Sequence, residues 1–262
     1  MAVTSGKGGV GKSNAALNLA IALSSLGQRV VIIDADLGMA NVEVLLGITP
    51  RYTLYDFLYH KKDLNEILTP GPGNIRIISG GVGLLELANL DNRAIKRLRD
   101  SMYHFDSGVD VVLVDTGAGI NKNVLAFVGA AQEVIIVVTP EPTSITDAYG
   151  LIKVLASYNV HNEVNVLVNR AAKRQEAGDT FYKLKITAQH YLPNVDIKYL
   201  GSIPEDKNVI RAVKDQRPFV LYQPATPASR AVRAVAEQLA GGVQKERGGF
   251  FDFFSRLTRL FN

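Results

Sequence analysis

The feature that most constrains this chain is a glycine-rich run near its start, Gly6-Lys7-Gly8-Gly9-Val10-Gly11-Lys12-Ser13. It follows an apolar stretch, opens a helical pattern, and matches the spacing G-x-x-x-x-G-K-[ST]. Glycines let the backbone curl so that its amide hydrogens point at phosphate oxygens, and the helix start adds positive potential. The sequence therefore predicts a phosphate-binding loop between a buried strand and a helix.

The rest of the chain alternates between buried-strand and helix patterns. The predicted strands are short, continuously apolar and rich in β-branched residues, as in parallel sheets covered on both faces. They are Arg29–Asp34, Ile75–Ser79, Asp110–Asp115, Glu133–Thr139 and Glu163–Asn169, with Met1–Thr4 and Ile197–Ile203 as additions. Helical spacing predicts helices at Ser13–Leu26, Asp91–Met102, Thr146–Ser157 and Pro227–Leu239. We therefore expect an α/β fold, a mostly parallel doubly wound sheet with helices on both faces.

Composition excludes several kinds of site. The chain of 262 residues has no cysteine, which excludes thiolate zinc sites, cysteine nucleophiles and iron–sulfur clusters. Its four histidines show no metal-ligand spacing. The net charge of +4 is compatible with an anionic ligand or membrane surface but too small to indicate nucleic acid by itself. No leader and no run of ~20 apolar residues is visible, so we expect a cytoplasmic protein.

The composition changes near the C-terminus. We expect a nucleotide-binding domain over residues 1–240, a polar linker over 241–249, and an amphipathic helix over 250–262. On a helical wheel most of the apolar side chains of the last segment share one side, opposite its arginines. They are Phe250, Phe251, Phe253, Phe254, Leu257, Leu260 and Phe261. Such a helix is too short to span a bilayer but suits its interface with anionic headgroups, the alternative being a helix docked on its own domain.

The loop itself supplies the first candidate site residues. Lys12 would neutralise the β- and γ-phosphates of a bound nucleotide, and the hydroxyl of Ser13 would ligate Mg²⁺. The nucleotide-binding residues expected here are Gly8, Gly9, Val10, Gly11, Lys12, Ser13 and Asn14.

Carboxylates end two of the predicted strands. Asp34 and Asp36 close the strand that begins at Arg29, at the edge where doubly wound sheets bind ligands. Asp115 follows four apolar residues, which is the Walker-B pattern. Its carboxylate would hold Mg²⁺ through a water, because this ion keeps much of its hydration shell.

The second lysine of the loop, Lys7, gives the form K-G-G-V-G-K-S, and here the sequence resembles the deviant Walker-A ATPases of the MinD/ParA family. The resemblance implies that Lys7 reaches the partner's nucleotide in an ATP-bound homodimer, as a catalytic residue together with Lys12. It also implies that Asp36 positions the attacking water, that Asp34 supports the magnesium shell, and that Asn41 faces the nucleotide. Gly119 would lie in flexible backbone near the γ-phosphate.

The same resemblance implies an adenine site assembled from two later loops. Asn169 and Arg170 follow one predicted strand, and Pro204 and Glu205 follow another. Asn169 would hydrogen-bond the base edge, and the turn at Pro204 would pack on the base.

Within this family, two stretches resemble the FlhG group (also called YlxH or FleN), the MinD-like regulators of flagellar number and placement. They are D-T-G-A-G-I at 115–120 and T-P-E-P-T-S-I-T-D-A-Y at 139–149. The resemblance implies partners: the FlhF GTPase, flagellar C-ring proteins or a flagellar transcription activator.

The sequence thus predicts a Mg²⁺-dependent ATPase, slow unless stimulated, that dimerises on ATP, binds the inner face of the membrane reversibly and is reset by hydrolysis to ADP. Two alternatives within the fold are a MinD-type division-site ATPase and a ParA-type DNA partition ATPase. The second would need a basic surface patch and would bind DNA with a steep salt dependence. The aromatic terminal helix argues against it, and specific nucleic-acid binding is not expected. An ATP-dependent ligase or synthetase is a third option and would need a second substrate pocket.

Overall fold

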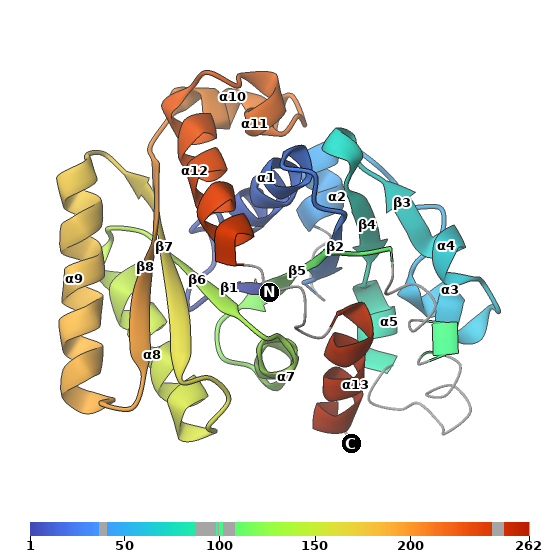
Figure 1. The fold of residues 1–262 in the computed structure, drawn as a ribbon, viewed down its shortest axis with the longest axis horizontal. Coiled ribbons are helices and arrows are strands. Elements are labelled where there is room, and N and C mark those ends of the chain that lie inside the picture. The colour runs from blue at the N-terminus through green and yellow to red at the C-terminus, as the bar shows by residue number, and fades with distance from the viewer. Residues whose placement is uncertain (37–40, 87–97, 99, 102–107, 243–248, 262) are drawn as a thin grey trace.

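The computed structural model describes residues 1–36, 41–86, 98, 100–101, 108–242 and 249–261 (Figure 1). Eight strands form one sheet in the order β3-β4-β2-β5-β1-β6-β7-β8. Neighbouring strands pair in parallel except β3, which runs antiparallel to β4 at one edge. The strand bounds are β1 Ala2–Ser5, β2 Val30–Ala35, β3 Leu68–Pro70, β4 Arg76–Ser79, β5 Val111–Ala118, β6 Val134–Val138, β7 Glu163–Ala171 and β8 Asp196–Pro204.

Helices cover both faces of the sheet, because its central strands are apolar on both sides. One face is covered by α1 (Lys12–Ser25), α2 (Asn41–Leu46), α10 (Lys207–Lys214), α11 (Phe219–Tyr222) and α12 (Pro227–Gly242). The other is covered by α3 (Leu54–Tyr59), α4 (Leu64–Ile67), α5 (Gly81–Glu86), α7 (Lys122–Ala130), α8 (Pro142–Ser157), α9 (Arg174–Tyr191) and α13 (Phe250–Phe261). A short 3₁₀ turn, η1 (Pro72–Asn74), joins β3 to β4. Figure 1 shows α1 and α12 above the sheet and α7 and α13 below it.

The predicted fold class is confirmed, and each predicted strand is present within a few residues of its expected bounds. Several elements of the structure do not follow from the sequence patterns: β3, η1, α2, α3, α4, α5, α7, α9, α10 and α11. The edge strand β3 spans only three residues, and α9 buries Ala177, Thr180, Leu184 and Ala188, of which only Leu184 is a large apolar residue. The helix predicted over Asp91–Met102 lies largely outside the described residues.

The C-terminal helix α13 is docked on the domain. It packs against α7 and buries Phe250, Phe253, Phe254 and Leu257 almost completely. Phe251 is half-buried, Leu260 is 53% exposed, and the side chain of Phe261 lies outside the described part of the chain. The predicted amphipathic face therefore exists, and in this structure the domain covers most of it. Within the described residues, no helix combines the length and apolarity needed to cross a bilayer.

The register of the central strands determines where the polar residues meet. Asp34 of β2 lies directly beside Asp115 of β5, and Asp115 in turn lies beside Val3 of β1. The loop that follows β1 therefore emerges next to both carboxylates. Strand order reverses around β1, and the carboxyl edge at such a switch point is where doubly wound sheets bind ligands.

Candidate nucleotide site

The glycine-rich loop connects β1 to α1 as predicted. Gly9 and Gly11 have φ of 79° and 85°, a left-handed conformation that favours glycine, and Gly11 is the N-cap of α1. Gly6 is required for a different reason, since a Cβ there would lie 2.3 Å from the carbonyl group of Asp147 in α8. Gly8 has ordinary φ, and a Cβ on it would meet no heavy atom within 4 Å. The loop is thus held between two helices with its centre open.

Lys12 and Asp115 form a buried ion pair at the base of the loop. Lys12 Nζ donates to Asp115 Oδ1 at 2.6 Å and to Ser13 Oγ at 3.3 Å. Burial raises the pKa of Asp115, and the charge of Lys12 opposes that rise. Among the described residues, Asp115 Oδ2 has no hydrogen-bond partner although it is buried. An unsatisfied buried carboxylate oxygen beside a hydroxyl fits a water-coordinated Mg²⁺, so the residues present fit the ion that the sequence implies.

Asp34 organises the chain after β2. Its Oδ1 accepts the amide of Asp36 at 3.2 Å, and its Oδ2 accepts the amide of Val42 at 2.9 Å. Burial raises the pKa of Asp34 to about 7, and the two amides counter it. The sequence predicts that Asp34 supports the magnesium shell; in the structure one of its oxygens holds the backbone just after β2 and the other holds the backbone at the start of α2. The described residues contain no group of three or more side chains placed to hold a metal ion alone.

Asp36 and Asn41 lie together at the mouth of the site. Asn41 Nδ2 donates to Asp36 Oδ2 at 2.8 Å. The other carboxylate oxygen of Asp36 would lie 3.8 Å from a Cβ on Gly117, so it faces the backbone that follows Asp115. Asn41 was predicted to face the nucleotide, and in this structure it orients the carboxylate predicted to position water.

Lys7 points to the start of α8. Its Nζ donates to Glu141 Oε2 and to Thr143 Oγ1, each at 2.9 Å. Lys7 holds the pKa of Glu141 below its usual range. Neither partner was predicted, because each is more than 130 residues away in the sequence. Gly119, expected near the γ-phosphate, donates its amide to the Ser5 carbonyl at 2.9 Å.

The predicted adenine residues line one cavity of about 240 Å³ beside the loop. It is lined by Gly11, Asn14, Ala15, Asn169, Arg170, Ile203, Pro204, Glu205, Asp206, Val209, Ile210 and Phe219. The apolar walls of α10 and α11 were missed, because such residues look like ordinary core in a sequence. Ile210 is 56% exposed, which is unusual for a core isoleucine and marks it as a cavity wall. Asn169 Nδ2 donates to the Val10 carbonyl at 2.7 Å, so it also holds the loop.

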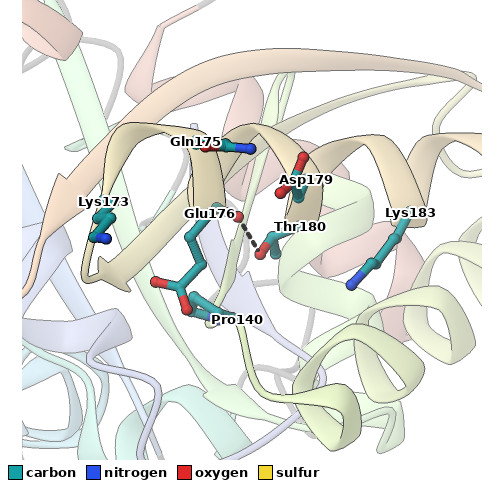
Figure 2. A pocket seen from close by; sticks show the side chains of 7 residues that line it. All are labelled: Pro140, Lys173, Gln175, Glu176, Asp179, Thr180 and Lys183. Carbon is teal, nitrogen blue, oxygen red and sulfur yellow. Dashed lines mark hydrogen bonds between the residues drawn. The ribbon is translucent and has the colours of Figure 1, made fainter.

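A second hollow of about 260 Å³ lies beside α9 and brings together none of the predicted residues. Figure 2 shows it between Pro140 and the first turns of α9, with Lys173 and Lys183 near Glu176 and Asp179. The Glu176 carboxylate already accepts the amide of Ala172 at 2.6 Å. The hollow beside α9 is lined by side chains of both charges, some of which already have hydrogen-bond partners. We therefore take the cavity beside the glycine-rich loop as the candidate site.

Comparisons with known proteins agree with this geometry. The family model described as ParA, NUBPL iron-transfer P-loop NTPase, matches residues 1–240. The chain is 44% identical to the antiactivator FleN of Pseudomonas aeruginosa over 239 residues, which cover 91% of this chain and 85% of FleN. It is 32% identical to the flagellum site-determining protein YlxH of Helicobacter pylori, covering 99% of this chain and 89% of YlxH.

The fold also matches a solved structure of the same kind. The MinC:MinD cell division complex of Aquifex aeolicus contains a chain that superposes with a TM-score of 0.70 at 28% identity, covering 92% of this chain and 95% of that one. This chain belongs to the ParA/MinD family of P-loop NTPases, and its glycine-rich loop, the carboxylates of Asp34 and Asp115 and the cavity lined by the predicted adenine residues agree with that assignment.

Proposed function

We propose that this protein is a Mg²⁺-dependent ATPase that works as a MinD-type switch and regulates flagellar number or placement. The observation that carries the catalytic part is the Lys12–Asp115 pair at 2.6 Å, which leaves one buried carboxylate oxygen without a partner. Gly11 of the glycine-rich loop lines the cavity of the predicted adenine residues, called the base cavity below. The flagellar part is supported by the similarity to FleN and YlxH, which are named for their roles as an antiactivator and in flagellum site determination.

Binding of the nucleotide phosphates would break the buried Lys12–Asp115 pair and give each residue a new partner. Lys12 would turn from Asp115 to the β- and γ-phosphates, and Asp115 and Ser13 would then be available to hold Mg²⁺. When bound, Mg²⁺ would supply charge neutralisation at the phosphate oxygens. The glycine-rich loop would donate its amides from the other side, since Gly8 leaves that space open.

Asp36 would orient the attacking water. Phosphoryl transfer needs mainly positioning and charge neutralisation, so a carboxylate held in place is sufficient. Asp36 is held by the amide contact to Asp34 and by Asn41. The γ-phosphate would lie beside Asp36 and the backbone that follows Asp115.

Lys7 would act in trans. In the present structure its ammonium group donates to Glu141 and Thr143 of its own chain. ATP-driven dimerisation would release Lys7 to the partner's nucleotide, and hydrolysis would return it.

The same cycle would release α13, whose buried phenylalanines would then enter the interface of an anionic membrane on the cytoplasmic side. Two short helices on one dimer gain affinity from their effective concentration, so membrane binding would follow the nucleotide.

The test of this function combines biochemistry with a cell phenotype. We expect the purified chain to hydrolyse ATP with Mg²⁺ and to lose turnover, but not nucleotide binding, in Asp36→Ala. A deletion strain of the source organism should show altered numbers or positions of flagella by electron microscopy, restored by the wild-type gene and not by Asp36→Ala.

Division-site selection is a second candidate, since the MinC:MinD chain shares the fold at 28% identity. Minicells in the deletion strain, with normal flagella, would favour it.

A further inference from the structure

The base cavity is joined to the segment that holds Asp36 by one turn of the chain. Helix α10 supplies Val209 and Ile210 to the cavity, and α11 supplies Phe219. The turn between these two helices, residues 215–218, leaves the cavity and contacts the C-terminal end of α2. A base bound in the cavity would therefore press on both helices that flank this turn.

Gln216 makes the contact. Its backbone has φ of 50°, and its Nε2 donates to the Val44 carbonyl in the last turn of α2 at 2.9 Å. Its side chain also lies against Gly47, where a Cβ would come within 2.7 Å of Gln216 Oε1. The backbone N–H of Gln216 donates to the Val213 carbonyl of α10. The side chain thus caps α2 from an element of the base cavity.

This hydrogen bond is exposed, and Gln216 also lines a hollow whose other lining residues are mostly apolar. The lining of this hollow, of about 270 Å³, includes Leu46 at the end of α2, Ile48 just after it, Pro218 at the N-cap of α11 and Leu221 within α11.

The N-terminal end of α2 contacts the two aspartates at and just after the end of β2. Asn41 holds Asp36, and the Val42 amide binds Asp34. Helix α2 has six residues and is therefore only ~9 Å long. Helices this short are not stable in isolation, so the position of α2 depends on what holds its two ends.

We propose that Gln216 is a positioning residue that couples occupancy of the base cavity to the placement of Asp36, so that turnover depends on the adenine base and not only on the phosphates. The proposal rests on the ATPase function proposed above. It adds a route from α10 through Gln216 to α2, by which an occupied base cavity orders the carboxylate that positions water.

Inorganic tripolyphosphate separates the two contributions, because it offers phosphates without a base. Gln216→Glu keeps the shape of the side chain and removes the donor. We expect it to lower kcat with ATP by roughly three- to tenfold, with little change in KM, as fits the loss of one hydrogen bond. Turnover of tripolyphosphate should equal that of the wild type. Gln216→Lys, which restores a donor, should recover ATP turnover, and Lys214→Ala, an exposed neighbour, serves as the matched control.

A direct readout follows from the absence of tryptophan in the chain. Val44 is 65% exposed, so Val44→Trp places a single fluorophore on α2. ADP should change its emission, pyrophosphate should not, and the ADP response should disappear when Gln216→Glu is added.

Two results would overturn the coupling. One is an equal loss of turnover with ATP and tripolyphosphate in Gln216→Glu, which would make Gln216 a structural residue only. The other is a Gln216→Glu variant identical to the wild type with both substrates. If the wild type neither binds nor hydrolyses ATP, the proposed ATPase function fails, and the coupling fails with it. If the wild type turns over ATP normally and either of the two results above is obtained, only the coupling through Gln216 is rejected.

Discussion

Lys7 and Glu141 form an ion pair within one chain, with Nζ and Oε2 2.9 Å apart. The lysine that distinguishes this loop from an ordinary phosphate loop is therefore held by the start of α8 rather than turned to a nucleotide. Both side chains are more than a third exposed, so the pair is screened by solvent and easily broken.

Glu141→Gln should shift this balance toward the free lysine. We expect the ATP-dependent dimer to form at lower nucleotide concentration, by less than about fivefold because exposed pairs contribute little. Lys7→Ala should bind ATP normally and form no dimer. Size-exclusion chromatography with light scattering, in ATP and in ADP, measures both. A Lys7→Ala variant that dimerises and turns over like the wild type would contradict the role of Lys7.

Lys12→Ala should unfold more easily as well as lose ATP. Lys12 is 7% exposed and Asp115 is fully buried, so the substitution leaves a buried carboxylate without its cation. Loss of one partner of a buried pair costs ~3–5 kcal/mol. We expect a lower urea midpoint and no binding in equilibrium dialysis. The double variant Lys12→Ala/Asp115→Asn provides the control: stability should largely return while ATP binding stays absent.

Gly129→Ile should detach α13 without changing its sequence. A Cβ on Gly129 would lie 3.1 Å from Leu260 Cδ1 and 3.3 Å from Val160 Cγ1, so the larger side chain of isoleucine would push against Leu260 and weaken the docking of α13. We expect this variant to sediment with phosphatidylglycerol vesicles in ADP as well as in ATP, whereas the wild type does so only in ATP. Gly150→Ile is the matched control, since a Cβ on that helical glycine meets nothing within 4 Å.

Deletion of residues 250–262 should abolish sedimentation in every background. Phe254→Asp should do the same with ATP binding intact. If the truncated chain sediments as well as the full one, membrane binding by α13 is wrong, and the helix is simply part of the domain.

His161 should make the stability of this region depend on pH. Its Nε2 lies 2.8 Å from the Val128 carbonyl of α7, and burial, with a further contribution from Arg256 of α13, lowers the pKa of His161 below 6.5. As pH falls through 6.5, the unfolded chain takes up a proton that the folded chain does not, so the free energy of unfolding decreases. Above that pH the effect is absent.

Urea unfolding at pH 7.5 and 5.5 tests this expectation. His161→Gln keeps a hydrogen-bond donor that cannot titrate, so its midpoint should fall less on acidification than that of the wild type. His190→Gln, on an exposed position of α9, should behave as the wild type does. Identical pH profiles for the wild type and His161→Gln would remove His161 from the explanation.

What the sequence predicts well is local. The loop, the strand that ends in Asp115 and the amphipathic face of 250–261 each follow from neighbouring residues, because spacing within a strand or helix determines which side chains share a face. The roles of Asp34 and Lys7 do not follow in this way. They depend on which distant backbone amides or carboxylates the fold brings within reach, and Glu141 is separated from Lys7 by 134 positions.

The walls of the base cavity show a second limit. Val209, Ile210 and Phe219 are apolar residues in helical patterns, and a sequence does not distinguish an apolar residue that faces the core from one that faces a cavity. The same holds for Phe250 and Phe254, whose spacing predicts an apolar face but not that α7 covers it.

Gly6 and Gly8 belong to the same loop, but a side chain at each position would have a different consequence. Gly6 is required by the folded protein itself, because any side chain would collide with the backbone of α8. Gly8 has neither a positive φ nor a neighbour, so the empty protein would accept an alanine there. A screen for expression or thermal stability would therefore reject changes at position 6 and pass them at position 8, and only selection in the presence of nucleotide would recover glycine at both.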